Sequence, residues 1–212
     1  MIGVHVTVPI ACFRKGMARE YLETEPIPPP STCYGFLLSL VGEVDRRRHC
    51  GVRVTPALVG QPDKSVILRT VWRVKSRPLG SAGNTRPDYQ QLLTGVELVI
   101  WLDSAEEQHE TPHLESRVAD SLDAGRRGRL ERFGGLSLGE STHLVDQVRL
   151  FPGDPNRQSL AFLVSSTGRL TLPVWVDHVG SAGTRFVTGD LQEMPLQPPD
   201  LHGMPRIEEN PS

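Results

Sequence analysis

The chain has 212 residues, a length that suits one domain with appendages. Hydrophobic residues make up only 38%, and Pro and Gly occur 18 and 20 times, so we expect long loops around a modest core rather than a large compact enzyme. No segment approaches the roughly 18 apolar residues of a membrane span, and the first residues lack the features of a signal peptide. The three cysteines, Cys12, Cys33 and Cys50, are scattered, which argues against a disulfide framework. We therefore expect a cytoplasmic protein without membrane contact.

The formal net charge of −2 conceals an uneven distribution. Residues 1–100 contain 13 Lys and Arg against 8 Asp and Glu, whereas residues 101–212 contain 10 against 17. Only three of the 23 basic residues are lysines, and arginine suits bidentate phosphate contacts and base stacking. Such a molecule is able to bind nucleic acid with one half and protein with the other.

The first strand is predicted over Ile2–Ile10, where valines alternate with polar residues. A loop with three basic residues, Arg14, Lys15 and Arg19, leads from this strand to Tyr21. These basic residues are either solvated loop charges or phosphate contacts beside the helix that follows.

The segment Tyr21–Val41 joins a proline-rich stretch to an apolar helix that includes Tyr34. The prolines hold the backbone extended, and Ser31 and Thr32 are placed to cap the helix. Gly42 is expected to end it. Two interpretations stay open: a stiff linker into a buried helix, or a helix start whose amides seat a phosphate.

Residues Glu43–Val59 are polar and then turn-like, and the cluster Arg46–His49 is interpreted as a solvated helix end. The next strand is predicted over Ser65–Arg77. Alternation places four cations on one face and Trp72 on the other, where Trp72 packs or stacks on a base. The four cations are Arg69, Arg73, Lys75 and Arg77. No acid occurs between Lys64 and Arg86, which favours RNA contact over a solvated strand edge.

The stretch Pro78–Thr94 is too long for a tight turn and predicts a protruding hairpin or loop that carries Arg86 and Tyr89. A central strand is then expected over Val96–Leu102, and a helix over Pro112–Ala124.

His109 and His113 stand four residues apart, a spacing that could ligate a metal ion, but a proline lies between them and no third ligand is evident. No metal site and no cofactor are predicted.

The segment Arg126–Glu140 contains Gly134, Gly135, Ser137 and Gly139, and glycines allow backbone amides to approach a ligand closely. A strand is predicted over His143–Phe151. The resulting order, strand–helix–strand–strand–helix–strand, is typical of an α+β, ferredoxin-like fold, which RNA-recognition motifs share; the consensus of those motifs is absent. Residues 1–151 form this predicted domain, residues 152–195 add further β segments, and residues 196–212 form a Pro-rich tail expected to be disordered.

Four segments together resemble the Cas-five family of CRISPR-associated proteins. They are the PIPPPSTCYGF stretch at 26–36, RTVWRVK at 69–75, PDYQQLLTGVELVIWLD at 87–103 and FGGLSLGESTHLV at 133–145. The resemblance covers about residues 1–150 and is closest to variants of type I-B and myxobacterial-type systems. It implies a RAMP protein, in which the loop at about 76–95 is a thumb and the Gly-rich loop lies against RNA.

The resemblance implies a subunit of a type I Cascade complex that binds the 5′ handle of the guide RNA (crRNA) in defence against phage or in transposon guidance. Its implied partners are the Cas-seven-type backbone subunits, the large Cascade subunit and target DNA near the protospacer-adjacent motif. The candidate RNA-binding residues are Arg14, Lys15, Arg19, Tyr21, Ser31, Thr32, Tyr34, Arg69, Trp72, Arg73, Lys75, Arg77, Arg86, Gly134, Gly135, Ser137 and Gly139.

Some type I-C relatives cleave precursor guide RNA with a Tyr, a Lys and an adjacent His. None of the lysines here, Lys15, Lys64 and Lys75, has a histidine beside it, and nothing in the sequence brings Tyr34 and His49 together. We therefore expect no catalytic activity, with a pre-crRNA endoribonuclease as the alternative.

Overall fold

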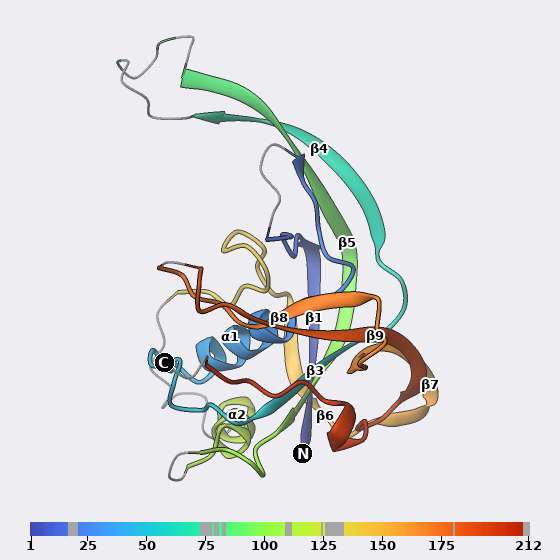
Figure 1. Ribbon diagram of the computed structural model, residues 1–212. Coiled ribbons are helices and arrows are strands. Elements are labelled where there is room, and N and C mark those ends of the chain that lie inside the picture. The colour runs from blue at the N-terminus through green and yellow to red at the C-terminus, as the bar shows by residue number, and fades with distance from the viewer. Residues whose placement is uncertain are drawn as a thin grey trace.

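The computed structural model describes residues 1–16, 21–72, 78, 81, 84–108, 112–123, 125, 134–179 and 181–209, with Trp72 described for its backbone only. The elements in chain order are β1 (Ile2–Ala11), β2 (Tyr21–Leu22), α1 (Pro30–Leu40), β3 (Arg53–Leu58), β4 (Asp63–Trp72), β5 (Thr85–Asp103), α2 (Leu114–Leu122), β6 (Gln147–Phe151), β7 (Asp154–Val164), β8 (Leu170–Trp175), β9 (Arg185–Leu196) and the short 3₁₀ helix η3 (Leu201–Gly203) (Figure 1). Within these ranges no helix is long and apolar enough to cross a membrane.

The described strands form one sheet of nine, almost entirely antiparallel, whose main path runs β6-β1-β5-β3-β7-β9-β8. β2 and β4 also pair with β5, away from this path. At its centre β1 pairs with β5 from Ile2 opposite Leu102 to Ala11 opposite Leu93. A large antiparallel sheet with few helices confirms the α+β expectation.

Both faces of the central sheet are covered. On one face α1 and α2 pack Leu37 and Leu114 against β5 residues such as Ile100. On the other face Trp101 packs with Leu196 and Met204 from the C-terminal segment. Because neither face meets water, the second half of β5 is a nearly continuous apolar run rather than an alternating one.

The strand β3 lies where the sequence predicted only polar and turn-like structure, so that prediction is wrong. Five of its six residues are buried, and it pairs with β5 along its whole length. A proline inside a strand removes one hydrogen bond from the sheet, and β3 contains Pro56. Val54 donates its amide outward to the Pro205 carbonyl at 2.9 Å. The missing amide of Pro56, two residues on, therefore faces the same outer edge, where β7 pairing begins only at Ala57.

The predicted strand at 65–77 is described up to residue 72, as β4. Among the described strands, β4 pairs with β5 alone and lies off the main path of the sheet. The two strands form a long hairpin, here called the arm, paired from Asp63 opposite Thr94 to Trp72 opposite Thr85. The arm projects beyond the rest of the sheet (Figure 1). β5 begins at Thr85, so residues 85–94 of the stretch predicted to be a protruding hairpin or loop are a strand of this hairpin.

The three β segments expected after residue 152 are strands β7, β8 and β9, which continue the sheet outward from β3. The tail was predicted to be disordered, and up to residue 209 this is wrong. Leu196 and Ile207 are fully buried, and the Ile207 amide donates to the Val52 carbonyl at 2.8 Å. The tail thus adds a short strand-like segment to the free edge of β3, which its proline-rich composition did not indicate.

Candidate nucleic-acid interface

A groove of about 490 Å³ runs along α1, and we call it the α1 groove. The helix contributes a row of small residues, Ser31, Gly35 and Ser39, whose spacing of four places them on one side. The opposite wall comes from the Gly-rich loop, through Ser137 and Gly139, and from β8 and the loop after it. Segments far apart in the sequence therefore meet around one surface, which combines hydroxyl groups and exposed backbone with apolar side chains and with the charged Arg46 and Glu43.

The start of α1 does not use the side-chain cap that the sequence predicted. Pro29 occupies the cap position without a side-chain hydrogen bond, and Ser31 and Thr32 lie inside the helix. The amides of Thr32 and Cys33 both donate to the Pro29 carbonyl, at 2.9 and 3.0 Å. Because these amides are already paired, the helix start is a weaker anion seat than expected. Gly42, with φ of 67°, ends the helix as predicted.

The glycines of the Gly-rich loop have different roles. Gly134 and Gly139 have φ values of 76° and 96°, which favour glycine. A Cβ on Gly139 would also lie 2.7 Å from the Cys12 carbonyl oxygen, so this glycine allows the loop to pack on the end of β1. Gly135 is exposed, and Ser137 forms an isolated bridge with Leu144.

His143 fastens this loop to β1. Its Nδ1 accepts from the amide of Cys12 at 3.2 Å and from the amide of Glu140 at 3.3 Å. Burial lowers the pKa of His143, and the nearby Arg69 cation lowers it further, against the opposing effect of Glu140. The neutral ring is therefore the form that holds the loop in place.

One face of the arm is turned toward the same loop. Gln90 donates from Nε2 to the Glu140 carboxylate at 3.0 Å. Arg69 lies directly opposite Asp88 on this face, and Arg86 pairs with Asp88 at 3.0 Å. The sequence had indicated a face of cations without an acid, but the fold places the buried Asp88 of β5 directly opposite Arg69.

Two tyrosines lie together at the base of the arm. Tyr21 in β2 pairs in register with Tyr89 in β5, and their ring centroids are 6.2 Å apart. The residues are 41% and 49% exposed, enough to offer ring surface to a base. Nearby, Arg14 is exposed, and Lys15 pairs at 3.5 Å with Glu23, which directly follows β2.

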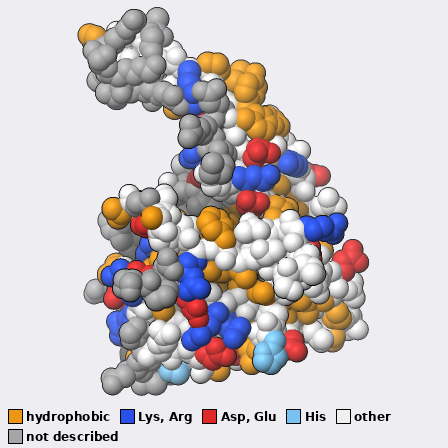
Figure 2. Space-filling view, in the orientation of Figure 1, with side chains coloured by type: hydrophobic (Ala, Val, Ile, Leu, Met, Phe, Trp, Pro, Cys, Tyr) orange, Lys and Arg blue, Asp and Glu red, His pale blue; other side chains and the backbone are white. Residues whose placement is uncertain are grey.

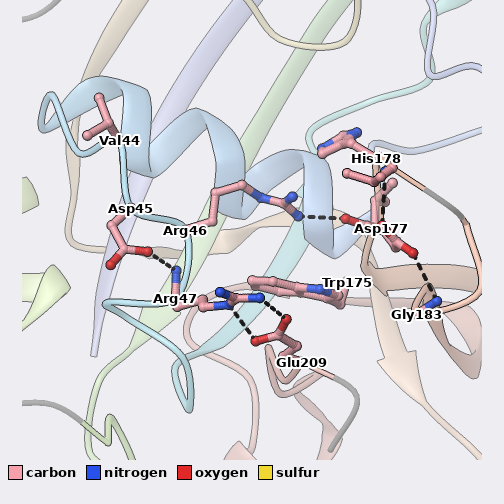
Figure 3. Close-up of a pocket in the computed structure, with 11 residues that line it drawn as sticks. Val44, Asp45, Arg46, Arg47, Trp175, Asp177, His178, Gly183 and Glu209 are labelled. Carbon is pink, nitrogen blue, oxygen red and sulfur yellow. Dashed lines mark hydrogen bonds and ion pairs between the residues drawn. The ribbon is translucent and has the colours of Figure 1, made fainter. Parts of the chain in front are cut away.

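Tyr34 positions Arg46 and does not present its own ring for stacking on a base. It is buried, and its hydroxyl donates to the Arg46 carbonyl at 2.7 Å. The Arg46 guanidinium lies 4.5 Å from the ring centre of Trp175 (Figure 3). Neither Arg46 nor Trp175 was a predicted site residue, because only the fold brings β8 beside the loop after α1.

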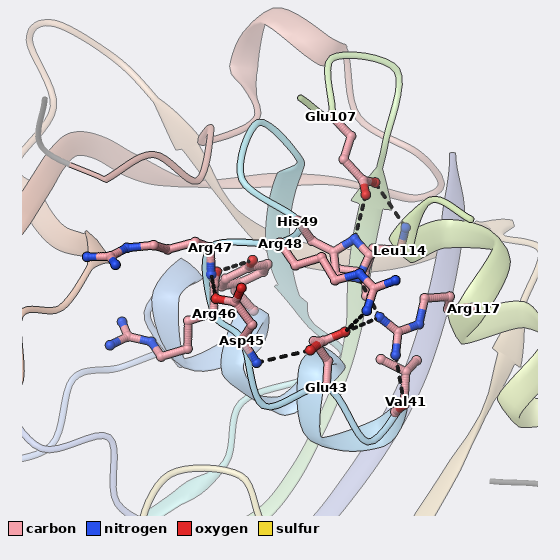
Figure 4. Close-up of polar contacts among 11 residues, drawn as sticks. Val41, Glu43, Asp45, Arg46, Arg47, Arg48, His49, Glu107, Leu114 and Arg117 are labelled. Atoms are coloured by element: carbon pink, nitrogen blue, oxygen red, sulfur yellow. Dashed lines mark hydrogen bonds and ion pairs between the residues drawn. The ribbon is translucent and has the colours of Figure 1, made fainter. Parts of the chain in front are cut away.

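That loop is held by a buried polar network (Figure 4). The His49 and Glu107 side chains are 1% and 0% exposed and pair at 2.5 Å. Arg117 in α2 donates to His49 Nε2 at 2.7 Å and also pairs with Glu43. The interpretation of the 46–49 cluster as solvated holds for the exposed arginines at 47 and 48 and is wrong for His49.

No family model matches the chain. A CRISPR-associated protein Cas5 of Myxococcus xanthus strain DK1622 is 51% identical to it over 210 residues, which cover 98% of this chain and 97% of that protein. The chain belongs to the Cas5 family of CRISPR-associated proteins. The family resemblance found in the sequence is thereby confirmed.

Two solved structures share the Cas5 chain's fold. A chain of a "CRISPR RNA-guided surveillance complex" aligns with a TM-score of 0.59 at 15% identity, covering 93% of this chain and 91% of that one. A second, titled "Crystal structure of Cas protein", aligns with a TM-score of 0.51 at 14% identity over 93% and 95%. At such identities the likeness concerns the fold.

The predicted RNA-binding residues of this Cas5 protein divide into four groups. The first borders the α1 groove and comprises Ser31, Thr32, Tyr34, Ser137 and Gly139. The second lies on the arm or at its base and comprises Arg14, Lys15, Tyr21, Arg69 and Arg86. The third consists of the exposed Gly134 and Gly135 at the start of the Gly-rich loop. The fourth falls outside the described residues and comprises Arg19, Arg73, Lys75, Arg77 and the Trp72 side chain. His109 falls outside them too, and within them no three His, Cys, Asp or Glu side chains are arranged to hold a metal ion.

Proposed function

We propose that this Cas5 protein is a non-catalytic subunit of a type I Cascade complex, of the type I-B kind, that binds the 5′ handle of crRNA. The observation that carries the proposal is the α1 groove, where helix, Gly-rich loop and β8 converge. Single-stranded RNA is recognised by hydrogen bonds from side chains and backbone and by stacking on aromatic rings or guanidinium planes. In the α1 groove, serine and threonine hydroxyls and the backbone at the exposed Gly35 are available for hydrogen bonds, and the Arg46 guanidinium plane is available for stacking.

The fold supports the finer proposal of a ferredoxin-like RAMP core. Four strands in the order β6-β1-β5-β3 are antiparallel neighbours. The helix α1 follows β1, and α2 follows β5. This arrangement suits a βαββαβ unit. The arm takes the place of a thumb, although its paired strands begin well before residue 76.

The arm also supports docking to other subunits. Val66, Ile67 and Leu68 in the edge strand β4 are 50%, 40% and 62% exposed. Figure 2 shows hydrophobic side chains along this outer side of the arm. An exposed apolar edge strand invites pairing or association. We propose that a Cas-seven-type backbone subunit covers this edge when the protein caps the filament, and that the large subunit docks beside it near the protospacer-adjacent motif.

The alternative, a pre-crRNA endoribonuclease, requires a base free to activate a 2′-hydroxyl. Tyr34 and His49 are both buried. The Tyr34 hydroxyl donates to a carbonyl, and burial raises the pKa of Tyr34. Both ring nitrogens of His49 are engaged, by Glu107 and Arg117. These contacts support a binding role for the groove rather than cleavage.

Binding of the purified protein to labelled repeat-derived handle RNA, against a scrambled RNA of equal length, tests the proposal. We expect preference for the handle, and we expect the same RNA to be recovered when the protein is co-expressed with its genomic neighbours. Equal affinity for both RNAs, together with recovery of unrelated RNA, would overturn handle recognition.

A further inference from the structure

A second cavity, of about 460 Å³, lies next to the α1 groove and is lined by Arg46, Arg47 and Glu209 among others (Figure 3). The two cavities adjoin, because five residues line both of them: Val44, Arg46, Trp175, Val176 and His178. Arg47, Asp177 and Glu209 line only the second cavity. A nucleic-acid strand that leaves the α1 groove past Arg46 would therefore enter it.

The shared wall is built as a stacking platform. The Arg46 guanidinium lies 4.5 Å from the Trp175 ring centre, and its Nη2 donates to the Val176 carbonyl at 2.8 Å. Trp175 is 5% exposed, so the indole supports the guanidinium from beneath and offers little surface of its own. A guanidinium held flat in this way is a surface on which RNA bases stack.

Beside the Arg46–Trp175 platform, the Glu209 carboxylate pairs with Arg47. Arg47 donates from Nε and Nη2 to the two oxygens of Glu209, at 2.8 and 2.7 Å. A phosphate group accepts two parallel hydrogen bonds from an arginine in the same bidentate geometry. The Arg47 and Glu209 side chains are 70% and 38% exposed, so solvent screens the pair and its opening costs little. The neighbouring Glu208 accepts a single contact from Arg185 at 3.2 Å.

We propose that this cavity binds one nucleotide of the handle RNA, with its base on Arg46 and its phosphate on Arg47, and that Glu209 holds the phosphate position in the free protein. The proposal rests on the proposed handle-binding function and extends it to a nucleotide outside the α1 groove. It assigns the acidic tail segment a role as an internal competitor of RNA.

The test is a double-mutant cycle on the full chain, with handle RNA binding followed by fluorescence anisotropy. Glu209→Gln should tighten binding severalfold because it frees Arg47. Arg47→Gln should weaken binding about tenfold, as expected for the loss of one charge-assisted contact. In the Arg47→Gln background, Glu209→Gln should have no further effect, because no competition remains.

Two control variants make the same charge changes away from the cavity. Arg169 is 93% exposed and pairs with Asp190, and Glu193 is exposed on β9. Arg169→Gln and Glu193→Gln should change affinity only slightly and additively. If the cavity variants behave like these controls while the wild type binds the handle, the cavity inference fails and the handle-binding function stands. A wild type that does not bind the handle would overturn both.

Discussion

His49 accepts a hydrogen bond at Nε2 from Arg117, 2.7 Å away, while its Nδ1 lies 2.5 Å from a Glu107 oxygen. A guanidinium only donates, so Nε2 carries no proton and the proton on Nδ1 points to the carboxylate. The ring is thus fixed as one neutral tautomer. This contact ties α2 to the loop that carries Arg46 and Arg47.

Replacing Arg117 by Met should destabilise the protein by about 2–3 kcal/mol, because the buried Glu43 and His49 each lose a charged partner. Arg48→Met is the matched control. It removes a second arginine from the same Glu43, but the Arg48 side chain is 50% exposed, so its loss should cost less than about 1 kcal/mol. Urea unfolding measures both. Equal losses would show that the network does not hold the loop.

Acidification should destabilise the protein in two stages. The pKa of His49 is lowered, chiefly by burial and against Glu107, and that of His143 is lowered by burial and Arg69. The folded state favours both neutral rings, so their contribution is complete above the unfolded pKa of about 6.5 and declines below it. Burial raises the pKa of Glu43, but hydrogen bonds from Arg117 and the Asp45 amide lower it to about 2. A further loss should therefore begin below about pH 4.5.

The first stage is checked with His143→Asn, whose side-chain oxygen is able to accept the two amides without titrating. Unfolding free energies at about pH 7.5 and about pH 5.5 should differ less for this variant than for the wild type. His143→Leu, which removes the acceptor, should lower stability at both pH values. An unchanged pH dependence in His143→Asn would contradict the role of His143.

The two loop glycines should respond differently to alanine. Gly139→Ala combines a left-handed backbone with a Cβ 2.7 Å from the Cys12 carbonyl oxygen, and should cost more than about 1–2 kcal/mol. At Gly135 the nearest atom to a Cβ is a Leu144 side-chain carbon at 3.4 Å, so Gly135→Ala should change stability by less than about 0.5 kcal/mol. Thermal melts of the two variants compare them directly, and a tolerant Gly139 would argue against close packing of the loop on β1.

Gly35 allows the α1 groove to be filled without disturbing the core. A Cβ there meets no atom within 4 Å, so Gly35→Ala should stabilise the helix by up to about 1 kcal/mol. Gly35→Trp should keep the fold and weaken handle binding by blocking the groove. Circular dichroism and anisotropy separate the two effects. Wild-type affinity in a folded Gly35→Trp protein would place the RNA elsewhere.

Repeat RNA incubated with the pure protein, with and without magnesium, should remain intact. The physical reason is that neither Tyr34 nor His49 has a free group to activate a 2′-hydroxyl. Denaturing gels give the readout. A single cut at the base of the repeat stem that persists without metal would favour the endoribonuclease alternative.

The sequence by itself determined the elements that rest on local patterns. Alternating valines identified β1, the apolar run with Gly42 identified α1, and the helical pattern over residues 112–124 identified α2. Four short motifs also identified the family. Each of these signals lies within a few residues, so it is visible without knowledge of distant neighbours.

The tertiary structure decided what depends on contacts between distant segments. β3 is a strand because its outer edge meets the tail and β7, and a proline there costs no hydrogen bond. Up to residue 209 the tail is ordered because isolated apolar residues, among them Ile207, pack at the free edge of β3. Asp88 comes to lie opposite Arg69 through strand pairing, and Arg46 comes to lie on Trp175 because β8 packs beside α1. No local pattern encodes these pairings, since the partners are separated by up to 155 residues, as Val52 and Ile207 are.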